Sequence, residues 1–172
     1  NCSDFIDDLN SWDMSSATDL SEMFYGVRTY DHNLNLWNVS RVRSFRSMFG
    51  GSQSRFNRDL SDWDVSAAVD MSSMFKGTTS FNQNISGWNV SNVATMTNMF
   101  YDANALSNTN KGLIHASFSS NSNWPYDWSA YADANATISG TINYTGPVTG
   151  PVVVWAKFDG QIVNTVTLPN GP

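Results

Sequence analysis

Cysteine and charge are both scarce in this chain, and each scarcity excludes a class of protein. The single cysteine, Cys2, rules out an internal disulfide and a thiolate metal cluster. Charged residues make up only 14% of the 172 residues, so Asn, Ser, Thr and Asp supply most of the polar surface, as is typical of exported proteins. No run approaches the roughly 18 apolar residues of a membrane span. The net charge of −6 argues against a nucleic-acid partner.

A repeat of about 25 residues occupies the first hundred positions. Tryptophans recur at intervals of 25, 26 and 25 residues, and Met-Phe pairs follow the same intervals. The one extra residue falls between Phe49 and Phe56, where a surface loop would tolerate an insertion. The predicted repeat core consists of these aromatic residues: Trp12, Trp37, Trp63, Trp88, Phe24, Phe49, Phe75 and Phe100.

Two kinds of apolar spacing follow each other within a unit. The pattern Leu-x-x-Trp-x-Val, as at Leu34, Trp37 and Val39, alternates like a short strand. Apolar residues then recur three apart, as at Met96 and Met99, which predicts a short helix. A serine stands ahead of each such segment and predicts a helix cap, at Ser15, Ser40, Ser66 and Ser91. We expect an α/β solenoid, leucine-rich-repeat-like, with short parallel strands and short helices.

Stacking is required because one unit cannot bury its own Trp, Met and Phe. Burial of four Trp side chains contributes on the order of 10 kcal/mol before entropy is counted, at about 25 cal/mol per Å². A sugar-binding ladder is an alternative interpretation of the same aromatic stripe. The core interpretation is favoured because the stripe has the phase of the core. Residues 1–102 are predicted to form the array of four units.

The fifth unit departs from the pattern. Residues 108–115 have the character of a helix, and residues 124–128 gather three aromatic residues around a proline. Repeat arrays need an atypical last unit to cover their exposed core. Residues 103–131 are therefore predicted to be a capping unit, with His115 as a cap residue rather than a metal ligand.

The stretches FNRDLSDWDVSAAVDMSSMFKG and FNQNISGWNVSNVATMTNMFYDA resemble the repeat of about 26 residues in BspA-like bacterial surface proteins. The stretch NKGLIHASFSSNSNWPYDWSAY resembles the unit that closes such arrays. The resemblance covers about three quarters of the chain. It implies a leucine-rich-repeat-like solenoid on an exported or cell-surface protein, associated with adhesion and surface assembly, and it brings no catalytic residues.

Composition changes after Tyr131. Residues 132–136 form a predicted linker, and residues 137–172 are rich in Val, Thr, Gly and Pro. Alternation and turn residues predict three strands there, at residues 138–144, 152–158 and 162–168. The stretch SGTINYTGPVTGPVVVWAKFDG resembles the opening strands of immunoglobulin-like or carboxypeptidase-regulatory-like β domains of bacterial surface proteins, which implies an incomplete β-sandwich.

Both ends of the predicted fold are incomplete. Three strands leave sheet edges unpaired, and the first repeat, residues 5–24, has no unit stacked before it. A fragment of a longer chain is one explanation. Head-to-tail assembly is the other, in which the β segment of one copy contacts the open end of the next and builds a filament or layer.

An acid or amide follows each repeat tryptophan and predicts a hydrogen-bonding ladder on an open face, at Asp13, Asn38, Asp64 and Asn89. Acid–base catalysis would require paired carboxylates in a cleft, so we predict no catalytic residue and no cofactor. Calcium binding by Asp59, Asp62 and Asp64 is an alternative without a known calcium-loop spacing. Candidate glycosylation sites begin Asn-x-Ser/Thr sequons, at Asn38, Asn89, Asn135 and Asn143.

All the arginines lie between residues 28 and 58. Arg41, Arg43 and Arg46 are candidate partner contacts, for an acidic neighbouring subunit or a polyanionic glycan. A solvated face without a partner is the alternative.

These patterns predict a non-enzymatic extracellular protein of the bacterial surface that assembles with copies of itself. An adhesin that binds glycan or protein through the solenoid face is the alternative. We expect no nucleic-acid partner and no membrane span.

Overall fold

The computed structural model describes these residues: 5–51, 53–132, 152–158 and 161–168. The chain divides into two compact units, Asn1–Asn135 and Ala136–Pro172, and each is considered by itself. Most of the predicted linker, from residue 133, and the predicted strand at residues 138–144 lie outside the described residues.

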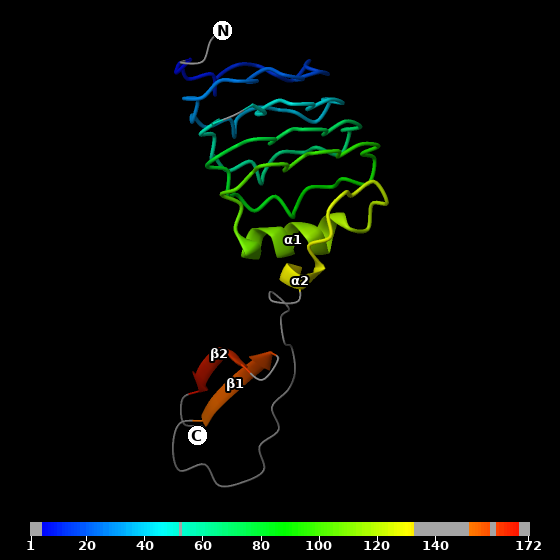
Figure 1. Cartoon of the computed structure of the whole chain (residues 1–172). Coiled ribbons are helices and arrows are strands. Elements are labelled where there is room, and N and C mark those ends of the chain that lie inside the picture. The colour runs from blue at the N-terminus through cyan, green and yellow to red at the C-terminus, as the bar shows by residue number, and fades with distance from the viewer. Residues whose placement is uncertain (1–4, 52, 133–151, 159–160, 169–172) are drawn as a thin grey trace. The chain divides into compact units, whose positions relative to one another are not determined.

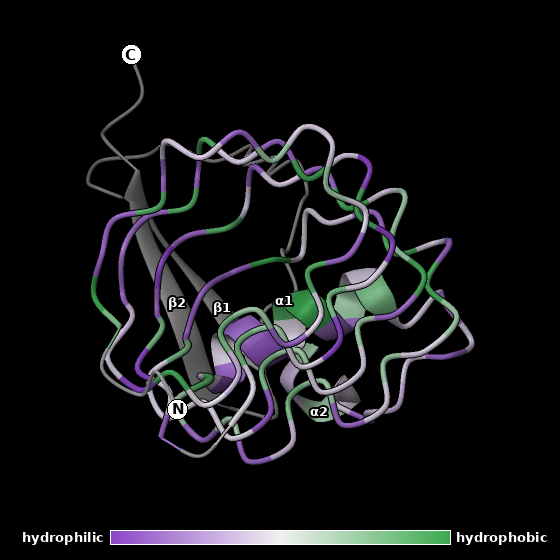
Figure 2. Ribbon diagram, turned by 90° about the horizontal axis from the view of Figure 1, so that it is seen from above, coloured by the Kyte–Doolittle hydropathy of each residue, from purple (hydrophilic) through white to green (hydrophobic). Residues whose placement is uncertain are grey.

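Successive repeats of the first unit lie one above another from residue 5 to residue 107 (Figure 1). Seen from above, the layers follow similar outlines around a shared interior (Figure 2). Isolated parallel bridges join equivalent positions of neighbouring repeats, at Asp19, Ser44, Asp70 and Thr95. The repeats are therefore in parallel register, but through single bridges rather than continuous strands.

The predicted strand at the Trp-x-Val step is wrong, because residues 37–39 and their equivalents belong to no strand. Each repeat tryptophan instead follows a tight turn, in which its amide donates to the carbonyl three residues earlier, as from Trp63 to Leu60 at 3.1 Å. The bridges lie further along each repeat, in the segment that was predicted to be helical.

The predicted short helix of each repeat is also wrong, because residues 5–51 and 53–107 contain no helix. The spacing of three comes from consecutive turns, as where the Met99 amide donates to the Met96 carbonyl at 3.0 Å. At equivalent positions of the four repeats, a non-glycine residue has a left-handed backbone with φ between 54° and 59°: Glu22, Ser47, Ser73 and Asn98. An α-helix needs right-handed backbone at every residue, so these positions prevent it.

Every second peptide group in these turns points along the stack. The carbonyls of the second repeat at Ser44, Arg46, Met48 and Gly50 accept amides of the first repeat at 2.8–2.9 Å. The amides that follow them, on the other side of the same peptide bonds, donate to the third repeat at 2.8–3.0 Å. The third repeat bonds to the fourth in the same sense. All these carbonyls face the preceding repeat, which gives the stack a direction.

Aromatic rings stack in two columns inside the layers. Neighbouring rings of the Phe24, Phe49, Phe75 and Phe100 column lie 5.5–5.7 Å apart between centroids. The indole of Trp63 lies 6.4 Å from that of Trp37 and 6.5 Å from that of Trp88. Each of these indole N–H groups donates to a leucine carbonyl of the preceding repeat at 2.8–3.0 Å. Stacking and a satisfied donor together favour Trp in this slot over another large apolar residue.

The predicted aromatic core is buried at every position except Trp12, with no side chain more than 5% exposed. Since Trp37, Trp63 and Trp88 are only 3–4% exposed, they cannot form a row of rings facing solvent. The sugar-ladder alternative is therefore wrong for these three tryptophans.

A further column is made of polar side chains. Its members directly follow Tyr30, Phe56 and Phe81, the aromatic residues of the loops, and are Asp31, Asn57 and Asn82. The side-chain oxygen of each accepts the backbone amide of the equivalent residue in the next repeat, at 2.8–2.9 Å. A donor from the next repeat also contacts each one, such as Gln83 on Asn57 and Asn110 on Asn82. This column, which the sequence interpretation missed, holds together the loops that the axial peptide bonds do not reach.

The last repeat is followed by helix α1 (Asn108–Phe118) and helix α2 (Ser129–Ala132), in the predicted capping segment. Helix α1 begins after Ser107, whose side chain accepts the Asn110 amide at 3.2 Å. Ile114 and Phe118 are fully buried against the end of the stack. Neither α1 nor α2, the helices of the described residues, has the length and apolar character to cross a membrane.

The second compact unit contains strands β1 (Val152–Phe158) and β2 (Gln161–Leu168), which pair antiparallel. Their register shifts between Ala156 and Lys157. Both strands fall where alternation predicted them. Within the described residues this is a sheet of two strands, so each strand has one edge without a described partner.

Glycine occupies a left-handed position after the Met-Phe pair in the first three repeats, and at Gly51 it also allows a close approach of two repeats. Gly26, Gly51 and Gly77 have φ values of 72°, 115° and 73° at equivalent positions. A Cβ added at Gly51 would lie 2.8 Å from the backbone nitrogen of Gly26, whereas one added at Gly26 or Gly87 has nothing within 4 Å.

Three alanine substitutions separate backbone strain from crowding. Gly26→Ala is expected to lower the free energy of unfolding by about 1–2 kcal/mol, the cost of a left-handed Ala. Gly51→Ala should cost more, because the Gly26 backbone must also move. Gly87→Ala, which has neither problem, is the control and should change stability by less than about 0.5 kcal/mol. Urea unfolding followed by tryptophan fluorescence measures all three, and equal losses would contradict the close approach.

The polar column predicts a difference between two substitutions at one position. Asn82→Ala removes an acceptor of two hydrogen bonds and should lower the free energy of unfolding by about 1–2 kcal/mol. Asn82→Asp keeps the acceptor, and both described partners are donors, so near-native stability is expected. Thermal unfolding at neutral pH compares the variants. An Asp variant as unstable as the Ala variant would show that the column does not act through this oxygen.

Candidate functional site

The first repeat of the described stack presents a row of backbone carbonyl groups along the stack. Asp19, Ser21, Met23 and Tyr25 are the first-repeat equivalents of the carbonyls that accept axial bonds in the second repeat. None of the four accepts a hydrogen bond from another described residue. Because such carbonyls are strong acceptors, this end of the stack can bind a segment that presents backbone amides.

Apolar side chains accompany this row. Trp12 is 52% exposed, so its assignment to the buried core is wrong. Its equivalents donate to a leucine carbonyl of a preceding repeat, and the described residues provide no such repeat for Trp12. Ile6 is 63% exposed, while Phe5, Met14 and Met23 are partly buried at the edge of the core. The end therefore combines polar acceptors with apolar surface.

The opposite end of the stack is covered. The Phe100 amide, which has the axial orientation, donates to the hydroxyl of Tyr126 at 2.8 Å, and burial raises the pKa of Tyr126. Trp124 and Trp128 pack on the Phe100 ring at centroid distances of 6.3 and 5.6 Å. His115 accepts the Trp124 indole N–H through Nδ1 at 3.1 Å. His115 thus lies within the cap and organises its aromatic cluster.

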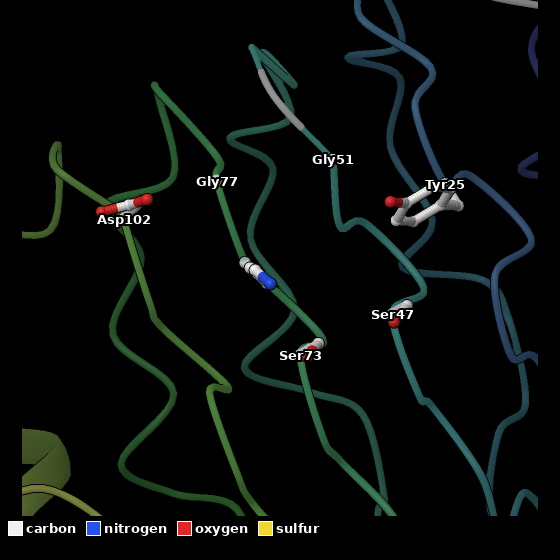
Figure 3. Close-up of a pocket in the computed structure, with 7 residues that line it drawn as sticks. Tyr25, Ser47, Gly51, Ser73, Gly77 and Asp102 are labelled. Atoms are coloured by element: carbon white, nitrogen blue, oxygen red, sulfur yellow. The ribbon is translucent and has the colours of Figure 1, made fainter.

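A polar groove of about 270 Å³ crosses the turns of several repeats (Figure 3). Its lining consists of Tyr25, Ser47, Gly51, Ser73, Lys76, Gly77 and Asp102. The Lys76 ammonium lies 5.6 Å from the centroid of the Tyr101 ring, so its charge is already engaged. Because the one cation of this lining is already engaged, we assign no chemistry to the groove.

The three arginines predicted as partner contacts are all exposed in the second repeat. Arg46 forms an ion pair with Glu22 of the first repeat at 2.7 Å. Arg41 and Arg43 have no described carboxylate within ion-pair distance, and neither lines a described groove. A different pair, Arg28 and Arg55, lines a common groove that the sequence interpretation did not single out.

The polar residues that follow the tryptophans form hydrogen bonds within their own turns, rather than a ladder of bonds between repeats. The side-chain oxygens of Asp13, Asn38, Asp64 and Asn89 each accept the amide of the serine two residues later at 2.9–3.2 Å. These serines therefore donate to a turn, and the prediction that they cap helices is wrong. Hydrogen bonds from Ser66 lower the pKa of Asp64, and those from Ser15 lower the pKa of Asp13. In the described residues, no three His, Cys, Asp or Glu side chains form a group that would hold a metal ion.

Two of the candidate glycosylation sites, Asn38 and Asn89, are exposed in the turns just described. Asn135 and Asn143 lie outside the described residues. Whether any of the four carries a sugar stays a prediction.

A family model described as "Mycoplasma protein of unknown function, DUF285" matches residues 1–112, which is more than half of the chain. The matched region contains the four repeats and the beginning of helix α1. No curated protein and no solved structure matches the chain.

Proposed function

We propose that this chain, which belongs to the DUF285 family, is a non-enzymatic structural and interaction protein of the bacterial surface that assembles through the open N-terminal end of its repeats. In this proposal the repeats form a solenoid of the leucine-rich-repeat-like class. The family is associated with BspA-like surface proteins, and a polar surface built from Asn, Ser, Thr and Asp suits an exported protein.

The contrast between the two ends of the stack carries the proposal. At the C-terminal end, α1, Tyr126 and the two tryptophans of the cap cover the last repeat. At the N-terminal end, four carbonyls and the half-exposed Trp12 have no such cover among the described residues. One covered end and one open end favour a directional contact, in which unlike surfaces meet and the assembly grows.

The β1–β2 hairpin of a neighbouring copy is the partner that we assign to the open end. An edge strand presents alternate backbone amides, and the first repeat presents alternate backbone carbonyls. The contact is therefore of the strand-addition kind, where main-chain hydrogen bonds give affinity and apolar side chains such as Trp12 add to it.

The proposal assigns contact rather than catalysis to the polar surface. Asp13, Asp64 and Asp127, whose pKa values are lowered by serine hydrogen bonds, are engaged in turns of their own backbone. Ionised acids in such turns solubilise the surface and stabilise local structure.

Two substitutions of exposed apolar residues test the assembly. Trp12→Glu places a charge at the open end and should weaken self-association of the full chain by about tenfold or more. Leu36→Glu is the matched control, since Leu36 is 73% exposed but belongs to the second repeat, which has neighbours on both sides. Sedimentation velocity over a concentration series measures both variants and the unmodified chain, and electron microscopy identifies any fibres.

The expected result is concentration-dependent assembly of the unmodified chain and of Leu36→Glu, and its loss in Trp12→Glu. Circular dichroism checks that both variants are folded. Equal weakening by the two substitutions would show that the end is not the contact. A strictly monomeric chain at every concentration would overturn the proposal.

A further inference from the structure

Positive charge is concentrated in one repeat of an otherwise acidic protein. Residues 28–58 contain every arginine and only one acid, Asp31, in a chain of net charge −6. Arg46 pairs with Glu22 at 2.7 Å, and Arg58 pairs with Asp31 at 2.9 Å. Arg28, Arg41, Arg43 and Arg55 have no carboxylate partner among the described residues. The second repeat and its flanks therefore carry positive charge that the protein itself does not neutralise.

Two of these unpaired arginines share a groove. Arg28 of the first repeat and Arg55 of the second line a hollow of about 450 Å³, together with Thr29, Gln53 and Thr79. The Arg55 amide donates to the Arg28 carbonyl at 3.1 Å, so the two backbones are joined directly. Their guanidinium groups thus emerge from adjacent repeats at one surface hollow.

The one-residue insertion of the repeat pattern falls at this groove. The extra residue lies between Phe49 and Phe56, and the groove residues Gln53 and Arg55 belong to the same loop. Gln53 has a left-handed backbone with φ 74°, at a place where the regular repeats have no such residue. The departure from the repeat therefore forms part of the hollow.

We infer that this groove binds an acidic polysaccharide, through its carboxylate or sulfate groups. A guanidinium group presents a planar fork of donors that matches both of these oxyanions. Gln53 supplies an amide group next to the two arginines, which suits a ligand that carries many hydroxyls. The hydroxyls of Thr29 and Thr79 donate to the Phe5 and Ser54 carbonyls at 3.3 Å.

The lining distinguishes this class from other polyanions. No aromatic side chain of the described residues lines the groove, so these residues offer no surface on which nucleobases could stack. Its described lining contains no apolar side chain either, and so provides no pocket for the anchoring residues of a peptide. The open N-terminal end is formed by other residues, and binding at the groove does not depend on assembly.

Two double substitutions with the same change of charge test the site. Arg28→Gln with Arg55→Gln removes both guanidinium groups of the groove. Arg41→Gln with Arg43→Gln removes two other unpaired, exposed arginines of the same region and is the matched control. Isothermal titration in about 50 mM salt, where surface charges are weakly screened, uses four probes: sulfated heparin fragments, carboxylated polygalacturonate, neutral dextran and poly-glutamate.

The groove variant is expected to weaken binding of heparin, polygalacturonate or both by about tenfold or more, while the control changes it by less than about twofold. The probe that binds identifies sulfate or carboxylate as the preferred group. Equal losses of affinity in the two double variants would show that binding depends only on overall charge, and would overturn the assignment of the site. Binding of poly-glutamate with the same arginine dependence would overturn the polysaccharide assignment, and so would an absence of binding to both acidic polysaccharides. A repeat of the titrations with Trp12→Glu separates this result from that of the assembly proposal.

Discussion

Alternate peptide groups that point along the stack are the constraint on which the rest of this structure depends. Each of them needs a carbonyl partner on one side and an amide partner on the other, because an unpaired backbone group away from water is costly. Interior repeats satisfy both sides at 2.8–3.0 Å. The first and last described repeats each satisfy only one side within the described residues, so these two ends of the described stack differ chemically. Tyr126 supplies an acceptor at the C-terminal end, whereas the N-terminal carbonyls stay open among the described residues.

The same constraint explains which residue types fill the interior of the stack. Repeats held at the distance of a hydrogen bond bring equivalent rings together, which selects flat aromatic side chains for the interior. An indole has a further advantage, since its N–H reaches the leucine carbonyl of the preceding repeat. The close approach also excludes a side chain at Gly51. The features that differ between repeats, namely the ends and the insertion between Phe49 and Phe56, are therefore the candidates for function.

The sequence predicted the period and the burial of the repeat aromatics other than Trp12, because a strict interval of identical large residues has few other physical explanations. It misassigned the local structure for a specific reason. A spacing of three is shared by helices and by consecutive tight turns, and Glu22 and Ser47, unlike Asn98, are not residue types that favour a left-handed backbone. Trp12 shows a second limit: its motif is that of Trp63, and only the absence of a described preceding repeat exposes it. The groove arginines were visible as a cluster, but their pairing depends on which loop residues meet across repeats.

Hydrogen exchange of individual amides, followed by NMR, tests the axial bonding most directly. Ser47 and Ser73 occupy equivalent positions and donate to the next repeat at 2.9 Å, whereas Asn98, their equivalent in the last repeat, has no acceptor among the described residues. The account predicts that the Ser47 and Ser73 amides exchange more slowly than the Asn98 amide, by about 100-fold or more after correction for sequence. Equal exchange at all three positions would contradict it.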